Sequence, residues 1–262
     1  MSSTYRFRVY AFGCNILLDA SDHKSHAVLE RYVFPWLPRV ANNGCPYDLH
    51  IRIDAIADQF QMSVDDVTVA SAPRAMGLVP GLIRTLDEAV VQRLTNLRAI
   101  HAGAVVLNGR ALLLPGATRA GKSSMIAELL RRGATYFSDE YALIDAYGRV
   151  HPYPRPLLLR NGCPEQVPML PEECNASVGN VPAPVGWILS LEYVPGCVWN
   201  IAPVPQSEAL LTLLRNTPHN LAESKDIVGV LQRAVAGAVC YAGQRSETAH
   251  AADEILKLVE NS

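Results

Sequence analysis

The stretch LLLPGATRAGKSS, residues 112–124, decides the fold of the chain around it. Three apolar residues lead into a turn, and Gly116-x-x-x-x-Gly121-Lys122-Ser123 then opens onto the helix-forming run MIAELLRR. A strand, a glycine loop and a helix in this order are what a phosphate-binding P-loop requires. The sequence therefore predicts a nucleotide-phosphate site. The alternative is a Gly/Ala-rich connection from strand to helix that carries a surface lysine.

The chemistry of a P-loop assigns a role to each position of this stretch. Backbone N–H groups surround the phosphates, and the helix N-terminus adds partial positive charge. The lysine meets the β- and γ-phosphates, the Ser123 hydroxyl ligates Mg²⁺, and the glycines allow close backbone approach. The residues expected to contact the nucleotide are Gly116, Ala117, Thr118, Arg119, Ala120, Gly121, Lys122, Ser123 and Ser124.

Composition limits the class of protein. The chain has 262 residues, of which 49% are hydrophobic, enough for the core of one large domain or two small ones. Its net charge of −2 indicates neither nucleic acid nor a membrane surface as a partner. We expect a cytoplasmic protein, because no signal-peptide pattern and no apolar run of about 20 residues occurs. The six cysteines lack C-x-x-C spacing, so we expect reduced, mostly buried thiols.

Residues 1–97 read as a mixed α+β region without recognisable chemistry, and we assign to it a role in substrate recognition. Alternating apolar residues predict its strands, and apolar residues at helical spacing predict its helices. The expected elements are a strand pair at 4–20, a helix at 26–36, a strand at 48–54, further β-structure at 63–73 and a helix at 80–97.

Residues 98–262 read as the P-loop domain, an α/β core with a partly antiparallel sheet. Asn108-Gly109 predicts a two-residue hairpin turn, and Gly133 is placed to end the P-loop helix. The expected strands are 100–107, 110–114, 134–145, a buried strand from 187 and 238–243; residues 161–184 read as a loop. The expected later helices are 207–217, 226–237 and a closing helix at 246–260 that begins at a Ser246 cap.

Several polar residues near the loop are candidates for chemistry. Asp139 and Glu140 lie in the strand after the P-loop helix, where P-loop proteins commonly place a carboxylate for Mg²⁺ or the nucleophile. The alternative is a surface pair at a strand end. His101 begins the hairpin that leads into the loop, although a lone histidine is more often structural. Arginines suit phosphate geometry, and the candidate phosphate clamps are Arg155, Arg160 and Arg215, although any one such arginine is more often an ordinary surface or interdomain residue.

Taken together, these residues resemble the catalytic core of the HPr kinase/phosphorylase family. The resemblance rests on HAGAV from His101, the Asn-Gly hairpin, GATRAGKSS, the following helix and the strand YFSDEYALI. It covers residues 99–160 well and the rest, up to the C-terminus, loosely. The C-terminal part is similar to shorter relatives of that family, including kinases encoded with ribosomal peptide tailoring genes. The resemblance thus implies a core of the HPr-kinase type with a mixed sheet.

The resemblance also implies an activity and roles for single residues. It implies transfer of a phosphoryl group from ATP to a serine hydroxyl of a peptide or small protein, with Mg²⁺ as cofactor. Asp139 then matches the general base, Glu140 a metal-assisting acid and Ser123 the Mg²⁺ ligand. His101 and Lys122 match the active-site histidine and the phosphate-binding lysine. Members of the family often form homo-oligomers.

The chain departs from the family pattern at three places. Arg119 stands where a third glycine is usual, and the acid pair is Asp-Glu followed by Tyr141 instead of Asp-Asp followed by a basic residue. The family's downstream Gly-rich segment, which serves phosphorolysis and substrate docking, is replaced by PRPLLLRNG. Two alternatives to the peptide kinase stay open: a kinase of small hydroxylated molecules, and a nucleotide-binding regulator without catalysis.

Overall fold

The structure is a computed structural model that describes residues 5–41, 44, 46–116, 120–160, 162, 165–218 and 226–261. The chain forms two compact units. Unit 1 comprises Met1–Thr95 and Arg160–Pro168, and unit 2 comprises Asn96–Leu159 and Met169–Ser262. The short second segment of unit 1 comes from the middle of the region that the sequence assigned to the P-loop domain. Each unit is described by itself.

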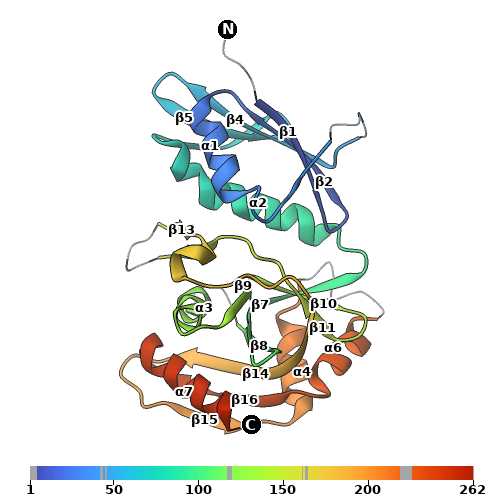
Figure 1. The fold of residues 1–262 in the computed structure, drawn as a ribbon, viewed down its shortest axis with the longest axis vertical. Helices are drawn as coiled ribbons and strands as arrows, with labels where there is room; N and C mark the ends of the chain where they lie inside the picture. The colour runs from blue at the N-terminus through green and yellow to red at the C-terminus, as the bar shows by residue number, and fades with distance from the viewer. Residues whose placement is uncertain are drawn as a thin grey trace. The chain divides into compact units, whose positions relative to one another are not determined.

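Unit 1 contains a six-stranded sheet with the strand order β3-β1-β2-β4-β5-β6 (Figure 1). β2 and β4 are parallel, and the other neighbours are antiparallel. The expected strand pair at 4–20 and the strand at 48–54 are confirmed. The strands are β1 (Tyr5–Ala11), β2 (Cys14–Ala20), β3 (Arg39–Val40), β4 (Leu49–Ile56), β5 (Gln59–Val64) and β6 (Val67–Ala72).

Helices cover one face of this sheet. α1 (His23–Tyr32) and α2 (Val79–Gln92) contact each other, and the short 3-10 helix η1 (Ala75–Leu78) precedes α2. Alternate strand residues such as Ile51 and Ile53 are buried, and α2 buries its apolar stripe, which includes Leu82 and Leu86. On β4 the alternate positions are polar, namely His50, Arg52 and Asp54. This alternation is why the period-2 pattern was readable in the sequence.

α1 begins three residues before the expected helix at 26–36 and ends earlier. Asp22 is its N-cap, and the Asp22 carboxylate accepts a hydrogen bond of 2.9 Å from the Ser25 N–H. The helix at 26–36 was predicted from the spacing of apolar residues, which does not take the Asp22 cap into account. After Tyr32 the chain leaves the helix through a turn in which the Trp36 indole donates to the Tyr32 carbonyl at 2.7 Å.

We expect Asp22→Ala to lower the free energy of unfolding by about 1 kcal/mol, the usual cost of losing an N-cap side chain. Urea unfolding monitored by circular dichroism measures this. Asp58→Ala is the control, because Asp58 is exposed in the turn between β4 and β5. Equal losses in the two variants would show that the cap does not stabilise α1.

Unit 2 contains a mixed sheet with the order β11-β10-β7-β8-β14-β16-β15, in which β9 also pairs with β7. β8, β14 and β16 are parallel, whereas the β7–β8 hairpin and β15 are antiparallel to their neighbours. The expected partly antiparallel sheet is therefore confirmed. Its strands are β7 (Leu97–Leu107), β8 (Arg110–Pro115), β9 (Thr135–Ser138), β10 (Tyr141–Asp145), β11 (Arg149–His151), β14 (Ala183–Tyr193), β15 (Asn200–Pro203) and β16 (Val239–Arg245).

Helices cover both faces of this sheet, so unit 2 is a three-layer α/β unit (Figure 1). Side chains of β8 alternate between two cores: Ala111 and Leu113 pack with α4 and α6, and Leu112 and Leu114 pack with α3 and α7. A strand buried on both faces reads as a continuous apolar run, as it does here. The helices are α3 (Lys122–Arg131), α4 (Gln206–Arg215), α6 (Ile227–Val235) and α7 (Thr248–Glu260).

The hairpin that delivers the chain to the P-loop has the expected turn. Asn108 and Gly109 have φ angles of 50° and 75°, the left-handed values that a type I′ turn needs at both central positions. β7 also comes close to α3, because a Cβ at Gly103 would lie 2.8 Å from the Ile126 side chain. The hairpin and the P-loop helix thus pack directly against each other.

Three expectations about unit 2 are corrected. The strand expected at 134–145 is interrupted at Asp139 and Glu140, which form a bend between β9 and β10 because both shorter strands pair with β7. Ser246 does not cap the closing helix: α7 has Glu247 at its N-cap position, without a capping side-chain bond. The region expected as a loop contains ordered elements, namely β13 (Val167–Met169), η2 (Pro171–Cys174) and the start of β14, and β12 (Leu157–Leu159) lies just before it.

Two further features of the described residues concern membrane-crossing helices and cysteines. Among the described residues, no helix has the length and apolar character that crossing a membrane would need. The four cysteines that the structure describes are free thiols, of which Cys14, Cys174 and Cys240 are buried and Cys197 is partly exposed.

Candidate active site

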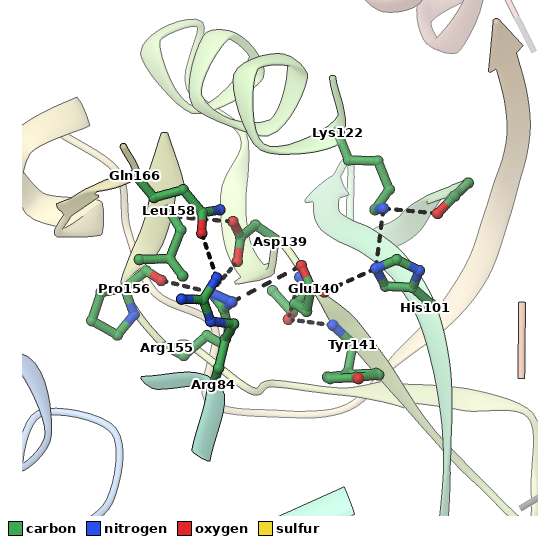
Figure 2. Close-up of polar contacts among 12 residues, drawn as sticks. Arg84, His101, Lys122, Asp139, Glu140, Tyr141, Arg155, Pro156, Leu158 and Gln166 are labelled. Atoms are coloured by element: carbon green, nitrogen blue, oxygen red, sulfur yellow. Dashed lines mark hydrogen bonds and ion pairs between the residues drawn. The ribbon is translucent and has the colours of Figure 1, made fainter. Parts of the chain in front are cut away.

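Five of the polar residues singled out in the sequence meet at one end of the β7–β8 hairpin (Figure 2). His101 comes from β7, Lys122 from the start of α3, and Asp139 and Glu140 from the bend between β9 and β10. Arg155 comes from the segment before β12. β7 pairs with both β8 and β9, and the Tyr153 N–H donates to the Phe137 carbonyl of β9 at 2.9 Å. These pairings bring the five side chains together.

Backbone bonds fix this arrangement around His101. The Gly116 N–H donates to the His101 carbonyl at 3.4 Å, and the Ala102 N–H donates to the Glu140 carbonyl at 3.1 Å. The His101 N–H in turn donates to the Asn216 carbonyl at 2.8 Å. The start of the P-loop, the acid pair and the end of α4 are therefore all tied to the same two residues of β7.

Lys122 is the first residue of α3 and is 9% exposed. Its ammonium group donates to the Gly116 carbonyl at 2.7 Å and lies 3.3 Å from the His101 Nε2. Burial lowers the pKa of Lys122, and the charges of Glu140 and Asp139 oppose that shift. A buried cation at the N-terminus of a helix is suited to an anion that enters with its own negative charge.

The rest of the loop is described in part. Ala117, Thr118 and Arg119 lie outside the described residues, so the expectations for these positions stay predictions. Gly121 has a φ of 78° and forms the left-handed N-cap of α3. A Cβ there would collide with the guanidinium of Arg245, which donates to the Ala120 and Gly121 carbonyls at 3.0 and 3.3 Å.

Arg245 is a site residue that the sequence interpretation missed. It is 3% exposed at the end of β16, and its guanidinium also lies 5.2 Å from the Tyr193 ring centroid. Its position depends on the parallel pairing of β14 with β16, which joins segments about 50 residues apart in sequence. No local pattern could have placed this arginine beneath the P-loop.

His101 and Glu140 form a pair on the more open side of the site. The His101 Nε2 lies 2.9 Å from the Glu140 Oε1, and the two side chains are 19% and 31% exposed. Burial would raise the pKa of Glu140, but the hydrogen bond from His101 and the charges of Arg155, His101 and Lys122 outweigh it, so the pKa is lowered. Glu140 is therefore ionised at neutral pH, as a proton acceptor must be.

Asp139 is the fully buried member of the acid pair. The Arg155 guanidinium donates to one carboxylate oxygen at 2.7 Å, and the Leu158 N–H donates to the other at 3.3 Å. The Ser123 side chain is close enough to act on this carboxylate, and it lowers the pKa of Asp139. Burial raises the pKa of Asp139, against the opposing effects of Arg155 and Ser123. In Figure 2 the Asp139 carboxylate lies beside the Arg155 guanidinium.

We expect Arg155→Leu to lower the free energy of unfolding by about 3 kcal/mol, because it leaves the buried Asp139 carboxylate without its counter-charge. Adding Asp139→Asn to Arg155→Leu should recover part of the lost free energy of unfolding, since a neutral amide leaves no unpaired charge in the core. Urea unfolding of the wild type, the two single variants and the double variant gives the coupling free energy. Additive losses in the double variant would contradict the pairing.

A cavity of about 450 Å³ opens beside the His101–Glu140 pair. Asp139 is not in its wall, whereas Glu140 and His101 are. Arg215 is exposed there, and no carboxylate in the described part of the chain pairs with it. The residues that line the cavity are His101, Glu140, Tyr141, Arg215, Asn216, Thr217 and Pro218.

The three candidate arginines thus have different positions. Arg155 is paired with Asp139, Arg215 lines the cavity, and Arg160 belongs to unit 1.

Among the described residues no group of three or more His, Cys, Asp or Glu side chains is arranged to hold a metal. A cation bound together with phosphate oxygens needs fewer protein ligands, and the hydroxyl of Ser123 and the carboxylate of Asp139 are adjacent oxygen donors of the type that Mg²⁺ prefers.

Comparisons with known proteins do not add to this description. No protein-family model matches the chain, and a search of curated proteins finds no significant match. The structure shows a fold of the α/β class with mixed sheets.

Proposed function

We propose that the chain is an ATP-dependent kinase with a P-loop core of the HPr-kinase type, which transfers the γ-phosphoryl group to a serine hydroxyl of a peptide or small protein. The observation that carries the proposal is the convergence of Lys122, the Ser123–Asp139 contact and the Glu140–His101 pair at the end of one hairpin. Phosphoryl transfer asks mainly for positioning and charge neutralisation, and these side chains offer both.

The positions of Asp139 and Glu140 favour different roles for these two acids. Ser123 and Asp139 would hold Mg²⁺, as the loop hydroxyl and a following carboxylate do in P-loop enzymes. Mg²⁺ would neutralise charge on the β- and γ-phosphates. Glu140 would be the general base, because it is ionised, it lines the cavity and His101 orients it. The family resemblance implied the reverse assignment, with Asp139 as the base, but Asp139 does not line the cavity in which the acceptor would bind.

In the proposed reaction the serine hydroxyl loses its proton to the Glu140 carboxylate and its oxygen forms a bond to the γ-phosphorus. The bond between the γ-phosphorus and the bridging oxygen breaks, and ADP departs with that electron pair. Lys122 would stabilise the charge that develops on the phosphate oxygens, and the N–H groups at the start of α3 would assist it. The Glu140 proton then passes to solvent through the open cavity.

The cavity beside Glu140 supports a peptide acceptor. It is wide enough for a serine together with a neighbouring side chain, and its wall combines an arginine, an amide and a hydroxyl with an aromatic ring. An enclosed pocket would instead favour a small metabolite. ATP and Mg²⁺ are the proposed cofactors, and a cytoplasmic location and homo-oligomeric assembly are further proposals that the site does not address.

Incubation of the full chain with Mg²⁺, ATP and a positional library of serine-containing peptides tests the proposal. We expect phosphoserine in a subset of the library and none when Mg²⁺ is chelated. A parallel screen of hydroxylated metabolites addresses the small-molecule alternative, which is favoured if metabolites are phosphorylated and no peptide is. A nucleotide-binding regulator without catalysis would bind ATP and would phosphorylate neither peptides nor metabolites.

A further inference from the structure

Unit 1 has a cavity of its own, of about 490 Å³. It lies between α1, the beginning of β5 and the connection from β6 to η1. Most of its wall is apolar, and Met76 is 43% exposed there. The apolar lining residues on which the argument depends are Ala27, Val28, Tyr32, Phe60, Pro73 and Met76. An apolar wall that remains open to solvent is a feature of binding sites.

The charged residues in the wall of this cavity are all basic. Lys24, Arg31 and Arg74 line it, and no Asp or Glu does. Lys24 and Arg74 are exposed, and in the described part of the chain neither forms an ion pair. The Arg31 guanidinium lies 5.5 Å from the Tyr32 ring centroid, which holds it at the wall. The chain as a whole is slightly acidic, so this local excess of positive charge selects an anionic ligand.

The neighbouring edge of the sheet favours an extended peptide as that ligand. β6 is the last strand in the sheet order, and within the described residues it pairs with β5 only. Its Val67 and Val69 are 65% and 52% exposed. β6 runs directly into Pro73 and Arg74, so a chain added along this edge would pass the cavity. Strand addition to an exposed edge is a common mode of peptide recognition.

We propose that this cavity binds an acidic peptide segment that inserts one large apolar side chain, and that the segment belongs to the peptide phosphorylated by unit 2. The second half of the proposal rests on the proposed function. The apolar side chain would pack against Phe60 and Met76, and the acidic residues beside it would meet Lys24 and Arg74. Unit 1 would therefore select the substrate, and unit 2 would carry out the transfer.

Fluorescence anisotropy with the full chain, without ATP, tests the binding step. The probe is a fluorescein-labelled peptide, Glu-Asp-Leu-Phe-Glu-Asp, which contains no hydroxyl residue. Arg74→Gln and Met76→Gln should each raise its Kd roughly tenfold, the effect of losing a charge-assisted bond or a buried apolar contact. Arg52→Gln and Ile56→Gln are the matched controls, since both residues are at least 40% exposed on β4 and line no part of the cavity. These controls should leave the Kd unchanged.

The inference is overturned if the probe does not bind, if Lys-Lys-Leu-Phe-Lys-Lys binds as well, or if the two cavity variants bind like the wild type. It is also overturned if octanoate binds more tightly than the probe with the same dependence on Arg74, because the ligand is then a small amphiphilic anion. Specific probe binding without phosphorylation of any peptide would contradict the proposed function and leave the binding site intact. Phosphorylation of peptides without probe binding would contradict the inference alone.

Discussion

Lys122→Ala is expected to reduce phosphoryl transfer about 10³-fold, the scale found when a single preorganised group that stabilises transition-state charge is removed. Its ammonium group lies 2.7 Å from the Gly116 carbonyl at the start of the predicted loop, from where it can turn to an entering phosphate. Initial rates with ATP and a peptide taken from the library measure the effect. The free energy of unfolding should not fall with the activity, because burial already disfavours this charge.

Lys257→Ala provides the control for this prediction. Lys257 is 65% exposed on α7 and pairs with Glu254, so its loss removes the same charge without touching the site. We expect wild-type rates in this variant. A Lys122→Ala protein that keeps more than about a tenth of the wild-type rate would contradict a role for this lysine in stabilising the transition state.

Glu140→Gln and Asp139→Asn are expected to impair the proposed phosphoryl transfer in different ways. As general base, Glu140 should contribute about 10²- to 10⁴-fold to kcat, so Glu140→Gln should lose this factor at any Mg²⁺ concentration. Asp139→Asn should instead raise the Mg²⁺ concentration needed for half-maximal activity, because it removes the charged oxygen ligand next to Ser123. Titration of Mg²⁺ at saturating ATP separates the two effects.

The opposite result is equally informative. If Asp139→Asn abolishes turnover at saturating Mg²⁺ and Glu140→Gln only weakens Mg²⁺ dependence, Asp139 is the base, as the family resemblance implied. If activity survives in both variants, neither carboxylate is the base. A regulator without catalysis would tolerate Asp139→Asn in its biological role and would lose that role in Lys122→Ala.

The pH dependence follows from the lowered pKa of Glu140. A base must be ionised to accept the serine proton, so the rate should stay level around neutral pH. The rate should fall only when the pH drops to the lowered pKa of Glu140, which lies below the ordinary range for a glutamate. His101→Phe should move this acid limb to higher pH, because it removes the hydrogen bond that lowers the pKa. An unmoved acid limb would contradict the pairing of His101 with Glu140.

The sequence predicted the parts of the site that local patterns determine. The hairpin turn at Asn108 depends on two left-handed residues, and the spacing around Gly121 places Lys122 at the start of a helix. Alternating apolar residues predicted strands of the unit 1 sheet, and short apolar runs predicted strands of the unit 2 sheet, including both strands of the hairpin. These features depend on neighbours within a few residues, which is why a single sequence contains them.

The sequence could not predict features that depend on long-range pairing. The bend at Asp139 arises because β9 and β10 both pair with β7, and a single apolar run in the sequence does not reveal two strands. The bond from Arg155 to Asp139 joins residues on different segments, and the cavity needs the end of α4 next to β7. The membership of Arg160–Pro168 in unit 1 likewise follows from tertiary contacts alone.

The most direct test of the central claim is mass spectrometry of serine peptides incubated with the wild-type chain, ATP and Mg²⁺, beside the Lys122→Ala chain. The account predicts peptides that gain one phosphoryl group on serine with the wild type and not with the variant. Binding of ATP by the wild type without phosphorylation of any peptide, together with phosphorylation of a hydroxylated metabolite, would contradict the claim.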